Sequence, residues 1–117
     1  MIDLQFLGVE DKLDQLAEKV SQYPDNLLFR YSYAQELFKA DQLIESIEQF
    51  KICTEGRPDW MMAFFCLAEA QISAGLNKEA VQSLVTTIDL ARKQEHDDPL
   101  EEASNLLASL KSQSSDI

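Results

Sequence analysis

A histidine beside an aspartate, at His96-Asp97, is the one pair of neighbouring residues in this chain whose types suggest a catalytic metal site. Metal-dependent hydrolysis needs several imidazole and carboxylate ligands around one ion. The chain has 1 histidine, so no second imidazole is available. We therefore predict no metal site, and we interpret the pair as a polar loop ahead of a helix start.

The candidate nucleophiles are two isolated cysteines, Cys53 and Cys66. A catalytic thiol needs a general base beside it, and His96 lies in a different segment of the chain. The acidic pairs Asp97-Asp98 and Glu101-Glu102 fit the positive end of a helix better than a general acid–base pair. No cluster of glycines predicts a phosphate-binding loop. The sequence thus predicts no enzyme, no catalytic residue and no cofactor.

The elements that would position any site follow from a fixed spacing, the repeat period, at which Pro24-Asp25 recurs as Pro58-Asp59. Residues of similar type recur at the same spacing, namely Ala34 with Ala68, Ala40 with Ala74, Glu45 with Glu79, Ser46 with Ala80, Ile47 with Val81 and Phe50 with Leu84. A fixed period of about 34 residues is typical of helix–turn–helix units that bury their apolar faces on one another. Apolar residues spaced by three and four within each unit indicate helices.

The charge and composition of the chain argue against several classes of partner and location. The formal net charge of −11 repels phosphate backbones, which disfavours nucleic acid. No apolar run reaches the roughly 20 residues of a membrane helix, and no signal peptide opens the chain. Two cysteines are too few for a disulfide framework. We expect a soluble cytoplasmic protein that does not engage a membrane.

The chain is predicted to form a single domain over residues 1–117. Its expected parts are a short apolar N-terminal segment (1–9), a half-repeat helix (10–23), a first repeat (24–57), a second repeat with an extended second helix (58–95), a capping helix (96–112) and a polar tail (113–117).

Helix ends are predicted from capping residues. Asp25 or Asn26 is expected to cap the first helix of the first repeat, and Asp59 its counterpart in the second. Asp98 is expected to cap the last helix, with a proline in its first turn. Gly56 is expected to take a left-handed conformation where a helix ends.

The repeat resembles the tetratricopeptide repeat family, in particular its small bacterial-type members, over about residues 24–90. The residues that fall on the family's motif are Tyr33, Ala34, Leu37, Ser46, Phe50, Cys53 and Pro58 in the first unit and Leu67, Ala68, Gly75, Ala80 and Leu84 in the second. The chain departs from that motif at Arg30, Asp41, Gln71 and Thr87. Residues 11–22 resemble the second helix of a preceding half unit. The resemblance implies an all-α, right-handed α-α superhelix of antiparallel helix pairs, with about six helices.

In the resembled family, the first helix of each unit lines a concave groove. One stripe of these helices, Tyr33, Ala34 and Leu37 in the first unit with Leu67 and Ala68 in the second, is expected to pack inward. A second stripe, on another side of the same helices and also at spacings of three and four, is mostly apolar. This predicted groove consists of Leu28, Tyr31, Gln35 and Phe38 in the first unit and Met62, Phe65, Glu69 and Ile72 in the second. An exposed patch of this kind typically marks a binding site. Alternatively, the terminal helix or the N-terminal residues Ile2, Leu4, Phe6 and Leu7 cover it.

We predict a non-enzymatic protein-interaction module that binds an apolar or amphipathic peptide or helix in this groove. The Lys and Asn residues of the family's clamp for C-terminal carboxylates are absent, which disfavours an acidic tail as the ligand. Two alternatives stay open. One is an acidic holding chaperone for a partner protein, and the other is a homodimeric scaffold whose groove receives a second copy.

Overall fold

The computed structural model describes the backbone of residues 4–115 and the side chains of residues 12–113. The described chain is made of helices and contains no strand. The six helices are α1 (Leu4–Gln22), α2 (Leu27–Lys39), α3 (Leu43–Gly56), α4 (Met61–Ser73), α5 (Asn77–Lys93) and α6 (Asp97–Ser115). The predicted all-α fold of about six helices is confirmed.

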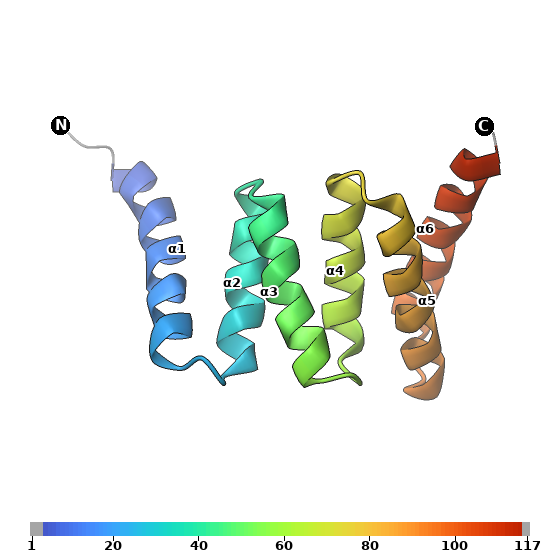
Figure 1. The fold of residues 1–117 in the computed structure, drawn as a ribbon, viewed down its shortest axis with the longest axis horizontal. Helices are drawn as coiled ribbons and strands as arrows, with labels where there is room; N and C mark the ends of the chain where they lie inside the picture. Colours follow the sequence, from blue (N-terminus) through green and yellow to red (C-terminus); the bar gives the residue numbers. More distant parts are fainter. Residues whose placement is uncertain (1–3, 116–117) are drawn as a thin grey trace.

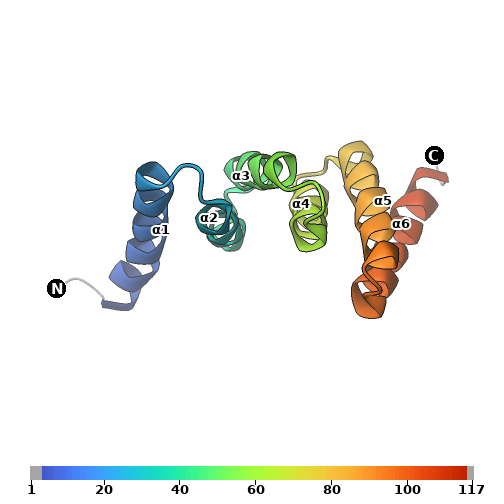
Figure 2. The ribbon, with the colours of Figure 1, turned by 90° about the horizontal axis from the view of Figure 1, so that it is seen from below.

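The helices form an elongated stack that measures 52 × 31 × 22 Å. In Figure 1, α1, α3 and α5 run down the page and α2, α4 and α6 run up, so that each helix is antiparallel to the next. The view from below shows α2 and α4 on one side of the stack and α3 on the other (Figure 2). The repeat therefore places two parallel helices, α2 and α4, next to each other with α3 behind them.

The register of the repeat is visible in the helix starts. Leu27 of α2 and Met61 of α4 lie one repeat period apart, as do Leu43 of α3 and Asn77 of α5. α1 begins at Leu4, earlier than the expected start of the half-repeat helix, and ends at Gln22. Ile2 lies outside the described residues. The division of the chain into repeats at 24–57 and 58–95 stays a prediction.

Three tight turns of the described chain use a left-handed residue, one of them Glu95 with φ of 58° between α5 and α6. Gly75 has φ of 78° between α4 and α5, and Asp41 has φ of 62° at the matching place between α2 and α3. Aspartate tolerates this conformation better than most residues, which explains why it can stand where the motif has glycine. The prediction for Gly56 is wrong, because it is not among the positive-φ glycines and instead ends α3 within the helix. A Cβ there would lie 2.6 Å from Leu27 Cδ1, so its small size permits a close approach of α2.

The helix caps differ between the repeats. The Asn26 side chain accepts hydrogen bonds from the backbone N–H groups of Leu28 at 3.1 Å and Phe29 at 3.2 Å. The expected cap at Asp59 is wrong, because Trp60 is the N-cap residue of α4 and makes no capping hydrogen bond. The indole of Trp60 instead packs on Tyr31, with ring centroids 4.6 Å apart. The expected cap at Asp98 is also wrong, because α6 already begins at Asp97.

Replacing Asn26 with alanine is expected to lower the free energy of unfolding by about 1 kcal/mol, because two N–H groups at the start of α2 lose their acceptor. Urea denaturation followed by circular dichroism measures the change. Asn26→Asp keeps an acceptor and serves as the control, with an expected loss of less than about 0.5 kcal/mol. Equal losses for the two variants would contradict the capping role.

The core is divided into two clusters. One joins α4, α5 and α6 around Phe65, Ala68, Leu84, Ile88, Ala103 and Leu110, and the other joins α2, α3 and α4 around Ala34, Ile47, Phe50, Leu67 and Ala70. Alanines with no exposed surface mark the closest helix contacts. At one of these, Ser46 Oγ donates a hydrogen bond of 2.8 Å to the Ala34 carbonyl oxygen, which fixes α3 against α2.

Candidate protein-binding groove

A pocket of about 220 Å³ lies where α2 and α4 run side by side over α3. Its lining combines apolar and polar side chains, namely Gln35, Phe38, Lys39, Phe50, Cys66 and Glu69. α2 and α4 each contribute one helical face, and Phe50 of α3 contributes to the lining. The pocket can therefore take an apolar side chain, with polar groups at its edge to orient the chain that carries it.

Three residues of the predicted groove, Gln35, Phe38 and Glu69, meet in this pocket. Two others lie on the surface outside it, since Leu28 is 61% exposed and Met62 is 39% exposed. These two sit near the N-terminal ends of α2 and α4. The predicted stripe is thus an exposed surface over part of its length, with the pocket toward the C-terminal half of α2.

Tyr31 is half-buried and packs between the repeats. Its hydroxyl group lies 3.4 Å from Cys66 Sγ on α4, and its ring centroid lies 5.8 Å from that of Phe50. Its ring also packs on that of Trp60, and the Arg57 guanidinium carbon lies 4.8 Å from the centroid of the Trp60 ring. Burial raises the pKa of Tyr31, and the nearby Cys66 adds to this. Tyr31 therefore joins α2 to α4 and stays a neutral phenol.

Phe65 and Ile72 belong to the interior of the C-terminal half. Phe65 is 5% exposed and lies in the cluster that α4 forms with α5 and α6. Ile72 is half-buried and packs against the same cluster. Neither residue lines the pocket. The cluster to which α6 contributes thus buries Phe65, while the terminal helix as a cover of the stripe stays a prediction. The side chains of Leu4, Phe6 and Leu7, the other candidate cover, are not described.

The sequence did not identify three lining residues, Lys39, Phe50 and Cys66. A signal for Cys66 was present, because it lies between Met62 and Glu69 at spacings of four and three and so shares their helical face. Phe50 was assigned to the core, where it also belongs, since its side chain is 1% exposed. Lys39 follows Phe38 directly in the last turn of α2.

The pKa values of two glutamates near the pocket are shifted by their surroundings. Partial burial and the Glu102 carboxylate raise the pKa of Glu69. The Lys12 ammonium, which lies 3.0 Å from Glu36 Oε1, lowers the pKa of that carboxyl group, and Lys39 contributes at 3.2 Å. Glu36 therefore stays ionised between α1 and α2, while Glu69 gains a proton at a higher pH than an ordinary glutamate.

The two thiols lie on α3 and α4, and the histidine lies between α5 and α6. Burial raises the pKa of Cys66, and it raises the pKa of Cys53 to about 11, so both thiols stay protonated near neutral pH. His96 is exposed at the turn between α5 and α6. Within the described part of the chain, no group of three or more His, Cys, Asp or Glu side chains is placed to hold a metal ion. None of the described helices is both long and apolar enough to cross a membrane.

Comparison with known proteins identifies the fold. No family model matches the sequence, and no curated protein matches it. Among solved structures, the TPR2B domain of yeast Sti1, in its complex with pHsp70, aligns with a TM-score of 0.80 at 17% identity, over 93% of this chain and 87% of that chain.

Two further structures agree. A tetratricopeptide repeat domain protein from Salinibacter ruber aligns with a TM-score of 0.69 at 21% identity, over 76% of this chain and 90% of that chain. A protein from Bordetella parapertussis aligns with a TM-score of 0.74 at 16% identity, over 97% of this chain and 91% of that chain. At these identities the similarity concerns the fold. Together with the regular register of the helix pairs, it shows that this chain has the tetratricopeptide-repeat fold.

Proposed function

We propose that this chain is a non-enzymatic protein-interaction module that binds an apolar or amphipathic peptide or helix across α2 and α4. The observation that carries the proposal is the pocket beside Phe38, which combines aromatic and thiol surface with the polar groups of Gln35, Lys39 and Glu69. The structure of the TPR2B domain of yeast Sti1 in its complex with pHsp70 is consistent with a protein or peptide as the partner.

In the proposed mode, one large apolar side chain of the partner fills the pocket. Gln35 and Glu69, on opposite helices, hydrogen-bond to the partner's polar groups at the edge. Leu28 and Met62 extend the contact toward the N-terminal ends of α2 and α4, where both side chains are exposed. Tyr31 stiffens the groove by its contacts with Cys66 and Trp60. Phe65 and Ile72 support α4 from behind rather than touch the partner.

The test begins with a peptide-display library selected on the immobilised protein. We expect the selected peptides to share one large apolar residue and to bind with an affinity that calorimetry can measure. Phe38→Ala removes one wall of the pocket, and Cys66→Phe fills it. Each change is expected to weaken binding at least tenfold, which corresponds to about 1.4 kcal/mol.

Ile44→Ala is the matched control, because Ile44 is an exposed apolar residue on α3, outside this pocket. Circular dichroism of every variant confirms that the helices are retained. If folded Cys66→Phe binds the selected peptides as tightly as the unchanged protein, the pocket is not the binding site and the proposal fails.

A further inference from the structure

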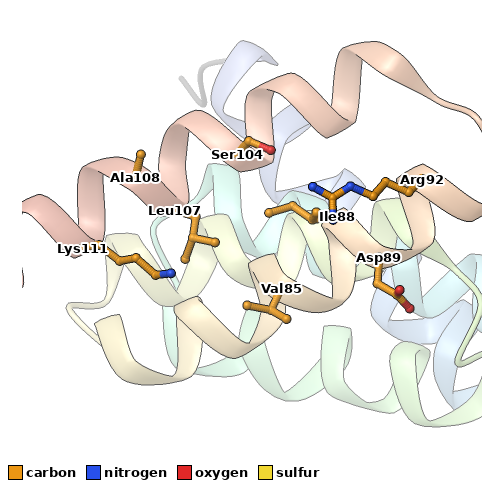
Figure 3. A pocket seen from close by; sticks show the side chains of 8 residues that line it. All are labelled: Val85, Ile88, Asp89, Arg92, Ser104, Leu107, Ala108 and Lys111. Carbon is orange, nitrogen blue, oxygen red and sulfur yellow. The ribbon is translucent and has the colours of Figure 1, made fainter.

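A second groove lies at the C-terminal end of the stack, between α5 and α6. Its volume is about 510 Å³, and its lining includes Val85, Ile88, Leu107 and Ala108 with Arg92 and Lys111 at its edges. Figure 3 looks onto this groove with the remaining helices behind it. No other described helix covers its apolar side chains, so one face of the last helix pair is open to a further helix.

A matching opening lies at the other end of the stack. A pocket of about 480 Å³ is lined by residues of both α1 and α2. Its α1 residues are Lys12, Gln15, Leu16 and Lys19. In the order given, they lie one repeat period before Ser46, Gln49, Phe50 and Cys53 of α3.

The α3 residues at those positions hold α2 in place. Ser46 Oγ donates to the Ala34 carbonyl oxygen, Gln49 Oε1 accepts a hydrogen bond of 2.9 Å from Arg30, and Cys53 Sγ lies 3.6 Å from the Leu27 carbonyl oxygen. α1 also runs in the same direction as α3 (Figure 1). It therefore presents to its pocket the face with which α3 holds α2, and a helix of the α2 type fits there.

α6 has the direction and, with a shift of one position, the register of such a helix. It runs parallel to α2 and α4 (Figure 1). Ala34 of α2 and Ala68 of α4 lie one repeat period apart, and Ala103 of α6 follows Ala68 by one position more than that period. All three alanines have no exposed surface. The same shift places Leu107 at the position of Phe38 and Ala108 at that of Lys39. In α2 these positions line the pocket with α3 and α4, and Lys39 also lines the one with α1, whereas in α6 they line the open groove.

We propose that copies of this chain join end to end: α6 of one copy lies in the pocket between α1 and α2 of the next, while α1 of that copy lies in the groove between α5 and α6. The two openings are thus the two halves of one joint, in which α6 and α1 form the helix pair that each lacks in its own copy. Such an interface joins different surfaces, so it produces open chains or rings rather than a symmetric pair.

Charge complementarity supports a second copy as the occupant. The net charge of −11 opposes association of copies, so the joint needs local attraction. The pocket between α1 and α2 is lined by three lysines, Lys12, Lys19 and Lys39, and by the Glu36 carboxylate, which pairs with Lys12 and Lys39. Its lining therefore keeps a net positive charge. The first turns of α6 carry the opposite charge, at Asp97, Asp98, Glu101 and Glu102. Lys19 lies one repeat period before Cys53, which contacts the first turn of α2, so in the joint Lys19 faces the first turn of α6.

The experiment is sedimentation velocity of the full chain over a concentration series at physiological ionic strength. We expect the unchanged chain to show species larger than dimers as concentration rises. Ala108→Arg blocks the groove of α5 and α6, and Lys19→Glu reverses a charge in the opposite pocket. Each variant is expected to associate at least tenfold more weakly. Ser109→Arg and Lys78→Glu are the matched controls, because both positions are exposed and line neither opening.

Mixing the two blocked variants identifies the direction of the joint. Ala108→Arg keeps an intact α1–α2 pocket, and Lys19→Glu keeps an intact α5–α6 groove, so the mixture is expected to form dimers that grow no further. A chain that stays monomeric at every concentration overturns the proposal, and so does an Ala108→Arg variant that associates as strongly as the unchanged chain. Neither substituted residue lines the pocket between α2 and α4, but Gln35 and Lys39 line both that pocket and the one between α1 and α2. Peptide binding is therefore measured separately on each variant, and both variants are expected to retain it.

Discussion

Phe50→Ala is expected to lower the free energy of unfolding by about 3–5 kcal/mol, a large part of the roughly 5–15 kcal/mol that stabilises a domain of ordinary size. Phe50 is 1% exposed and is among the largest fully buried side chains of the described chain. It packs among Ala34, Ile47 and Leu67, and edge-on to Tyr31. Its loss leaves a cavity where α2, α3 and α4 meet, which these helices can close only by moving their backbones. Urea denaturation at equilibrium measures the effect.

Two control variants test whether the loss comes from the buried volume of Phe50. Ile44→Ala, on the same helix but at a side chain that is 62% exposed, is expected to change stability by no more than about 0.5 kcal/mol. Phe50→Leu retains most of the apolar volume and is expected to lose less than half as much as Phe50→Ala. If Phe50→Ala costs no more than Ile44→Ala, the three helices do not depend on this residue for their packing.

Ser83→Ala is expected to lower the free energy of unfolding by about 1–3 kcal/mol, although it deletes a single oxygen atom. Ser83 Oγ donates a hydrogen bond of 2.7 Å to Gln71 Oε1, and both side chains are buried. Removing the hydroxyl group leaves the amide oxygen of Gln71 between α4 and α5 without this donor. An unsatisfied buried acceptor costs more than the hydrogen bond itself contributes.

The control is the double variant Ser83→Ala with Gln71→Leu, which removes both polar partners and keeps a side chain of similar size. It is expected to recover much of the stability that Ser83→Ala loses, because no polar group is then left unpaired. A double-mutant cycle in urea gives the coupling energy between the two residues. Additive losses in that cycle would mean that the hydrogen bond is not a coupled pair.

The repeat was readable from the sequence because its signals are periodic along one chain. The apolar spacing within each helix involves residues three and four apart, and the Pro-Asp pairs and the small residues at Ala34 and Ala68 recur at the repeat period. These signals predicted the all-α stack of six helices, and the structure confirms it. Even Asp41, which departs from the motif, fits the same turn as Gly75 because it adopts a left-handed conformation.

Departures from the motif needed the structure for their explanation. Gln71, which stands where the motif has an aromatic residue, is satisfied by Ser83 on the next helix. Trp60 replaces the cap expected at Asp59, because its ring packs on Tyr31 of the preceding unit. In both cases the partner lies on a different helix, and a periodic pattern within one helix carries no information about it.

The candidate site divides in the same way. The sequence by itself determined which residues share a helical face, and this was enough to bring Gln35, Phe38 and Glu69 to one pocket. Tertiary structure alone decided how much of that face stays open. Phe65 is buried in the cluster with α5 and α6, whereas Leu28 remains exposed. The physical reason is that helical periodicity is fixed by the backbone of one segment, while burial depends on which distant helices pack against it.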